Sequence, residues 1–127
     1  MLENPAGIFY DLGFTGETRF SSCKMKPRLL VKGETDCLAD KNGLLAMFDR
    51  PREGALEAIG GTGDTLTGIV TALINSGLGI ELAAIKAAEV NRLAGALAKP
   101  TPATPVYEII EQIPLALARV FEGGKTN

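Results

Sequence analysis

Gly60-Gly61-Thr62-Gly63-Asp64, followed by the uncharged run Thr65 to Ser76, is the stretch of the chain that decides its fold and its chemistry. Three glycines around a threonine let the backbone turn tightly and leave its N–H groups accessible. The run behind them is long enough for a helix, and Gly77 suits a C-terminal cap. Because the first amides of a helix have no internal partner and lie at the positive end of its dipole, the sequence predicts an anion-binding turn at a helix start.

Asp64 is compatible with two roles in this turn. Aspartate is among the favoured N-terminal caps of helices. Beside a phosphate held by the amides, the same carboxylate can take the proton from a hydroxyl that attacks the phosphorus. The residues alone leave both roles open, and they are also compatible with a tight turn that only packs a helix against a strand.

Composition limits the classes of function. The chain has 127 residues, of which 46% are hydrophobic and 22% charged, as expected for one globular domain. A net charge of −2 without a basic cluster argues against nucleic-acid partners, and the short apolar runs and the N-terminus predict a cytoplasmic protein without a membrane contact. The sequence has no histidine and no C-x-x-C spacing, which excludes the common zinc sites and histidine-based catalysis. Proton chemistry therefore falls to a carboxylate, lysine, tyrosine or thiol.

The chain divides into three segments of a single domain covering residues 1–127. Residues 1–26 form an irregular lead-in, residues 28–49 form strands and a hairpin, and residues 60–122 form the glycine loop and helices. A short apolar run ending at Val31-Lys32-Gly33 predicts a strand. The runs 37–40 and 44–48, separated by Lys41-Asn42-Gly43, predict a β-hairpin because Asn-Gly is a strong hairpin signal.

Three helices are expected in the second half. The helix over 65–76 has no charge beyond Asp64 and should be buried, and its Gly68 suits close helix packing. Residues 80–98 are rich in alanine and should pack on more than one side, with a narrow polar stripe that includes Arg92. The last helix is predicted to start at a Thr104 cap, with Pro105 in its first position, and to be kinked or interrupted by Pro114.

From Leu29 to about Phe121, the order of strand, hairpin, Gly-Gly-Thr-Gly-Asp and helices resembles the C-terminal half of ribokinase-like proteins. The run from Gly60 to Val70 is most similar to the ADP/ATP-dependent NAD(P)H-hydrate dehydratases, which are carbohydrate kinase-like, and the ending Ile113 to Leu117 is similar as well. The resemblance implies an α/β fold: a truncated ribokinase-like fold, with a small sheet containing a β-hairpin followed by three helices.

The resemblance also implies roles for individual residues. It implies phosphate binding by Gly60, Gly61, Thr62 and Gly63, with Gly61 and Gly63 forming the anion hole, and makes Asp64 the base that activates an acceptor hydroxyl. It puts Lys32 and Gly33 near the nucleotide pocket. The nucleotide would be ATP or ADP with Mg²⁺, and the activity a lyase reaction on hydrated NAD(P)H, or a small-molecule kinase reaction.

Departures from the family pattern lead to a second hypothesis. Members of the family are about twice as long, and Arg52-Glu53-Gly54-Ala55 stands where they carry a Gly-Asn-Pro-Gly-like sequence. Half of a doubly wound sheet leaves an uncovered edge and face, so we expect a homo-oligomer or a partner chain that completes the fold. The alternative function is a non-catalytic nucleotide-binding or structural module.

Overall fold

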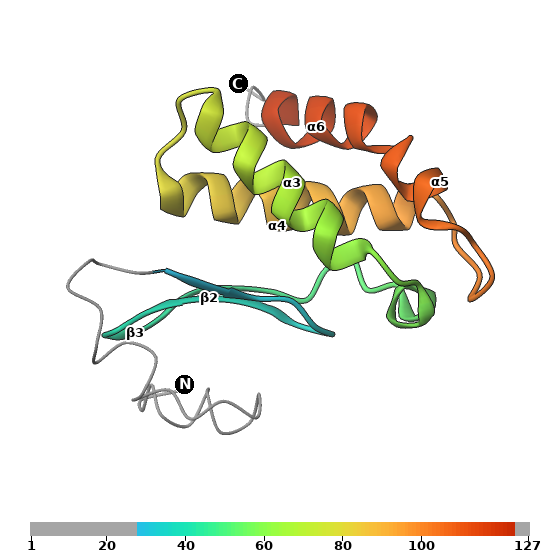
Figure 1. Cartoon of the computed structure of the whole chain (residues 1–127), viewed down its shortest axis with the longest axis horizontal. Helices are drawn as coiled ribbons and strands as arrows, with labels where there is room; N and C mark the ends of the chain where they lie inside the picture. Colours follow the sequence, from blue (N-terminus) through green and yellow to red (C-terminus); the bar gives the residue numbers. More distant parts are fainter. Residues whose placement is uncertain (1–27, 124–127) are drawn as a thin grey trace.

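The computed structural model describes residues 28–123, and the predicted lead-in over residues 1–26 lies outside that range (Figure 1). Three strands come first: β1 (Leu29–Val31), β2 (Asp36–Asp40) and β3 (Gly43–Phe48). A 3₁₀ helix, η1 (Gly54–Ala58), follows them. The remaining elements are α3 (Thr62–Asn75), α4 (Ile80–Leu97), α5 (Val106–Ile110) and α6 (Ile113–Glu122).

The strands form an antiparallel sheet in the order β1-β2-β3. Both the strand at Leu29–Val31 and the hairpin are confirmed. Asp40 pairs with Gly43 across the hairpin, and its Oδ1 accepts a hydrogen bond from the Asn42 N–H at 2.7 Å. Gly43 has a φ of 136°, which explains the glycine after Asn42. The molecule is thus an α/β fragment, and the parallel strands of a doubly wound sheet are not among the strands of residues 28–123.

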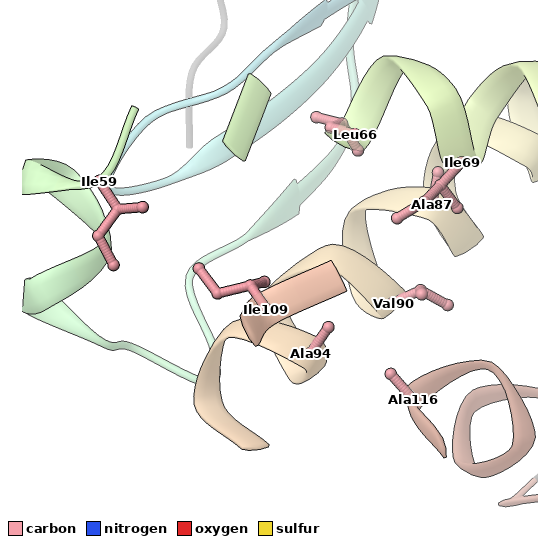
Figure 2. Packing of buried hydrophobic residues seen from close by; sticks show 8 residues of the cluster. All are labelled: Ile59, Leu66, Ile69, Ala87, Val90, Ala94, Ile109 and Ala116. Carbon is pink, nitrogen blue, oxygen red and sulfur yellow. The ribbon is translucent and has the colours of Figure 1, made fainter. Parts of the chain in front are cut away.

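Helix α4 lies at the centre of the molecule, as its composition predicts. It packs against β2 and β3 on one side and against α3, α5 and α6 on others, and the helices cover one face of the sheet (Figure 1). Its small side chains let several neighbours approach, and a Cβ added at Gly95 would lie only 2.5 Å from Leu56 Cδ1 of η1. The core around it, drawn in Figure 2, consists of Ile59, Leu66, Ile69, Ala87, Val90, Ala94, Ile109 and Ala116.

The prediction that the first helix is buried is wrong. Only Thr62, Leu66 and Ile69 of α3 are buried, and the opposite face, with Gly68 and Ala72, is exposed. Nothing among the described residues lies within 4 Å of a Cβ added at Gly68, so close packing at this glycine is not found here. The exposed side of α3 has no charge beyond Asp64 but carries threonines as well as small apolar residues, and residues 28–123 supply cover for one side only.

The end of α3 follows its sequence signal. Gly77 adopts a φ of 106°, and the Leu78 N–H donates a hydrogen bond to the Leu73 carbonyl at 3.1 Å. The Gly77 N–H donates to the Ile74 carbonyl at 3.0 Å, which completes a Schellman cap.

The final helix is interrupted, as Pro114 predicts. Helices α5 and α6 are separate, and Pro114 lies in the first turn of α6, where a missing N–H costs no helical hydrogen bond. The predicted cap at Thr104 is wrong, because Pro105 is the N-cap of α5 and precedes its first residue. The Thr104 hydroxyl instead accepts a hydrogen bond from the Thr101 N–H at 2.9 Å. Within residues 28–123, no helix combines the length and apolar character needed to cross a bilayer.

Candidate functional site

The glycine turn brings the chain into α3 through a backbone conformation that favours glycine. Gly61, the N-cap residue, has φ 94° and ψ −7°, in the left-handed region. A Cβ at this position would also meet the Val106 side chain at 3.4 Å. The turn therefore has both a conformational and a steric reason for glycine at position 61.

The amides at the start of α3 are available for a ligand. The first helical hydrogen bond runs from the Thr65 N–H to the Gly61 carbonyl at 3.0 Å, and no side chain caps the helix. Gly63 and Asp64 are exposed, and their N–H groups donate no hydrogen bond to any residue in 28–123. Asp64 is the third residue of the helix and not its cap, which leaves its carboxylate exposed beside these amides. Together they form a positive helix end with an adjacent carboxylate.

A cavity of about 390 Å³ opens on one side of this helix start. It lies between the β1–β2 turn, the segment leading into η1, and helices α4 and α5. Its lining residues are Lys32, Gly33, Glu34, Asp36, Pro51, Arg52, Glu53, Gly54, Leu56, Glu57, Ile59, Thr62, Asn91, Arg92 and Ile109.

A buried ion pair shapes the wall of this cavity. Arg92 Nη1 of α4 lies 3.0 Å from Asp36 Oδ2 of β2, although the contact lacks hydrogen-bond geometry, and the two side chains are 10% and 1% exposed. Asp36 Oδ1 accepts a hydrogen bond from the Gly33 N–H at 3.0 Å, and Arg92 Nη2 donates to the Glu34 carbonyl at 2.8 Å. The pair thus fixes the turn between β1 and β2 against α4.

Arg92 corrects the sequence analysis, which put it in an exposed stripe. The reason is the contact with Asp36, which lies on a strand far away in the sequence. Asp36 was given no role, although a carboxylate leading into the buried run Cys37-Leu38-Ala39 is a signal that a buried cation is needed.

Asn91 connects α4 to the start of α3. Its Nδ2 donates to the Thr62 carbonyl at 3.3 Å, while its Oδ1 and the Arg92 Nε have no hydrogen-bond partner among residues 28–123. Buried polar atoms in proteins usually form hydrogen bonds. Because Asn91 and Arg92 line the cavity, these two atoms are available to form hydrogen bonds with a ligand. Neither residue was singled out from the sequence as part of a site.

A second, largely apolar groove of about 540 Å³ lies on the other side of the helix start, between α3 and the α5–α6 region. Its lining residues are Gly61, Asp64, Thr65, Gly68, Ile69, Ala72, Leu73, Val106, Ile110, Ile113 and Leu117.

The structure does not bring the predicted site residues together in one cavity. Lys32, Gly33 and Thr62 line the cavity, whereas Gly61 and Asp64 line the groove. Gly63 lines a smaller pocket of about 290 Å³ together with Lys32. Gly60 is exposed in the turn and lines none of these three. The start of α3 separates the cavity from the groove, so its backbone amides lie between them.

Cys37 lines neither the cavity nor the groove. Cys37 is buried on β2, and burial, followed by the neighbouring Asp36 charge, raises the pKa of its thiol. A raised pKa disfavours the reactive thiolate. Among residues 28–123, no group of three or more histidine, cysteine, aspartate or glutamate side chains is arranged to hold a metal ion.

Comparison with known proteins identifies the family. A family model described as NAD(P)H-hydrate dehydratase, of the carbohydrate kinase type, matches residues 18–115. The chain belongs to this family. Within it, the chain is 42% identical over 99 residues to an uncharacterized protein of Methanocaldococcus jannaschii, covering 78% of the chain and 43% of that protein. It is 41% identical over 96 residues to the bifunctional NAD(P)H-hydrate repair enzyme Nnr of Hyperthermus butylicus, covering 74% of the chain and 17% of that enzyme.

The match to this family is partial in length. The chain spans less than half the length of the curated relatives it matches. No solved structure is significantly similar to it.

Proposed function

We propose that this protein is a nucleotide-binding domain of the truncated ribokinase-like type, related to ATP- or ADP-dependent NAD(P)H-hydrate dehydratases. The observation that carries the proposal is the pair of amides at Gly63 and Asp64, which donate no hydrogen bond to any residue in 28–123 and lie at the positive end of α3, a helix start that borders both the cavity and the groove. Family membership supports it, because the matched family model is described by this activity.

The cavity is the proposed nucleotide side. Its volume of about 390 Å³ falls within the range of small-molecule sites, and its lining combines apolar side chains such as Ile59 and Ile109 with polar ones. A nucleotide there would direct its phosphates to the start of α3, near Thr62, with Lys32 and Gly33 beside them. A Mg²⁺ ion would be held mainly by the phosphates, as is common for this ion.

The groove is the proposed acceptor side. A hydroxyl approaching from the groove would meet Asp64, while the phosphoryl donor lies on the cavity side of the same turn. In the transfer, the bond from phosphorus to the acceptor oxygen forms as the bond to the leaving phosphate breaks, and Asp64 takes the hydroxyl proton. For a hydrated nicotinamide, the phosphorylated hydroxyl then leaves as phosphate while the neighbouring ring carbon loses a proton to solvent, and the double bond that forms restores the dinucleotide.

The groove also supports the second part of the proposal, a contact with another chain. It is mostly apolar and open, and the exposed face of α3 forms one of its walls. Exposed apolar surfaces mark contacts with other chains as well as ligand-binding grooves. We therefore include a homo-oligomer, or a partner chain completing the fold, in the proposal. A nucleotide-binding module without catalysis is the alternative if the acceptor side is never completed.

Titration calorimetry with ATP and with ADP tests the phosphate site. The wild type should bind, and Gly63→Val should weaken binding at least tenfold because the new side chain fills the space in front of the amides. Gly79→Val is the matched control, since both glycines are exposed, neither has a described atom within 4 Å of an added Cβ, and Gly79 lines neither the cavity nor the groove. No binding of either nucleotide at millimolar concentration would remove both functions.

Recovery of NADH absorbance from hydrated NADH, with ATP or ADP present, tests catalysis. Asp64→Asn should retain nucleotide binding and lose turnover by about 10²–10⁴-fold, the usual contribution of a general base. Asp49→Asn, at another exposed position, is the control. Binding by the wild type without turnover would favour the non-catalytic module, and a strictly monomeric mass in solution would contradict the oligomer proposal.

A further inference from the structure

An ion pair spans the mouth of the cavity. Arg52 Nη1 lies 2.6 Å from Glu34 Oε1, and both residues line the cavity. Glu34 belongs to the β1–β2 turn, whereas Arg52 belongs to the segment between β3 and η1. The two side chains are 62% and 48% exposed, so this contact lies at the solvent boundary of the site.

The charges that line the cavity leave few cations for an anion. Four residues carry carboxylates: Glu34, Asp36, Glu53 and Glu57. Three residues carry positive charge: Lys32, Arg52 and Arg92. Arg92 is buried and held by Asp36, and Arg52 is held by Glu34, whereas Lys32 forms no ion pair with any residue in 28–123. A polyphosphate entering the cavity thus meets one uncommitted cation.

The pair between Glu34 and Arg52 can be exchanged at little cost. Exposed ion pairs contribute little to stability because water screens the attraction between their charges. The Glu34 backbone is fixed by the hydrogen bond from Arg92 to its carbonyl at 2.8 Å, so Arg52 is the partner that can turn. Arg52 contacts Glu34 through Nη1, whereas a phosphate group offers the guanidinium two parallel hydrogen bonds and more negative charge than a carboxylate, which makes phosphate the stronger partner.

We infer that Arg52 is a phosphate-binding residue of this cavity and that Glu34 holds it in the absence of ligand. When a polyphosphate binds, its oxygens replace the Glu34 carboxylate on the Arg52 guanidinium. The inference rests on the proposed function, and adds to it a residue from the segment in which the sequence departs from its family's pattern.

A double-mutant cycle on the pair tests the inference, with calorimetric titration of ATP and of tripolyphosphate at low salt. Glu34→Gln should bind both ligands about two- to fivefold more tightly, because Arg52 no longer has to leave a carboxylate. Arg52→Gln should bind both about five- to tenfold more weakly. In the double variant the gain from Glu34→Gln should disappear, so that it binds like Arg52→Gln.

Glu122→Gln is the control for net charge, because it makes the same change of one unit at the exposed last residue of α6. It should leave both dissociation constants within twofold of the wild type. Both residues of the tested pair are largely exposed, so their glutamine variants should fold, and a urea unfolding curve of each variant checks this.

The outcomes separate the inference from the proposal beneath it. If the wild type binds ATP but the gain from Glu34→Gln persists in the Arg52→Gln background, the carboxylate acts only through general repulsion and the inference is wrong. Unchanged affinity in Arg52→Gln would also overturn it, and the proposed function would stand. If the wild type binds neither ATP nor tripolyphosphate, both are wrong.

Discussion

Replacement of Arg92 by methionine should cost this protein a large part of its stability. The substitution retains an unbranched side chain of similar length but removes the charge that faces Asp36. Among the described residues, Asp36, 1% exposed, would then keep only the Gly33 N–H at 3.0 Å as a partner, and the Glu34 carbonyl would lose its donor at 2.8 Å.

The magnitude follows from that burial. Removing one partner from a buried ion pair costs about 3–5 kcal/mol, because the other charge remains buried and uncompensated. Total folding free energies are about 5–15 kcal/mol, so the loss would be a major fraction. For a urea dependence of about 1.5 kcal/mol/M, the unfolding midpoint should fall by about 2–3 M.

Urea unfolding followed by circular dichroism measures the loss, and two further variants interpret it. Arg119→Met, the same substitution at an exposed position of α6, should change the free energy of unfolding by less than about 0.5 kcal/mol. Asp36→Asn in the Arg92→Met background should recover part of the loss, because a neutral amide costs less to bury than a carboxylate. A loss of less than about 1 kcal/mol in Arg92→Met, or no recovery in the double variant, would refute the reasoning.

Three further measurements address the turn, the thiol and the core. Gly61→Ala should lower the free energy of unfolding by about 1–2 kcal/mol, because the backbone at Gly61 is in the left-handed region. Gly68→Ala should raise the free energy of unfolding by up to about 1 kcal/mol, because Gly68 lies in a helix with open space beside it. Thermal unfolding should therefore show shifts in Tm of opposite sign for the two variants. Because the pKa of the Cys37 thiol is raised in the folded protein, its contribution to the free energy of unfolding should be fully present below the unfolded thiol pKa of about 8.5 and should decline as pH rises from there through the folded pKa. Cys37→Ala should lack this decline in urea titrations at alkaline pH. Leu38→Ala, at a fully buried position of β2, should cost about 2–5 kcal/mol in the same assay, and a cost near zero would contradict its burial.

Features set by neighbouring residues were predicted well from the sequence. The hairpin follows from Asn42-Gly43, the end of α3 from Gly77, and the break between α5 and α6 from Pro114. Each depends on the backbone preferences of one or two residues, which act within a turn. The glycine turn was also predicted, because its three glycines indicate a tight turn at the start of a helix.

Features set by distant contacts were missed. The partner of Arg92 is a strand residue far earlier in the chain, so the helix pattern alone suggested an exposed position. The scarcity of charge on α3 predicted a buried helix, but it carried no information about what covers the helix, and only one side of α3 is buried. The cavity has the same origin, since Asn91 and Asp36 line one space only after the sheet and α4 have packed.

The central place of α4 has a consequence for synthesis on the ribosome. The sheet is complete at Phe48, but the helix that packs on β2 and β3 ends only at Leu97. At about 5–20 residues per second, several seconds pass between the emergence of the hairpin and that of the helix that covers it. During that interval the apolar side of the hairpin is open to chaperones and to neighbouring nascent chains.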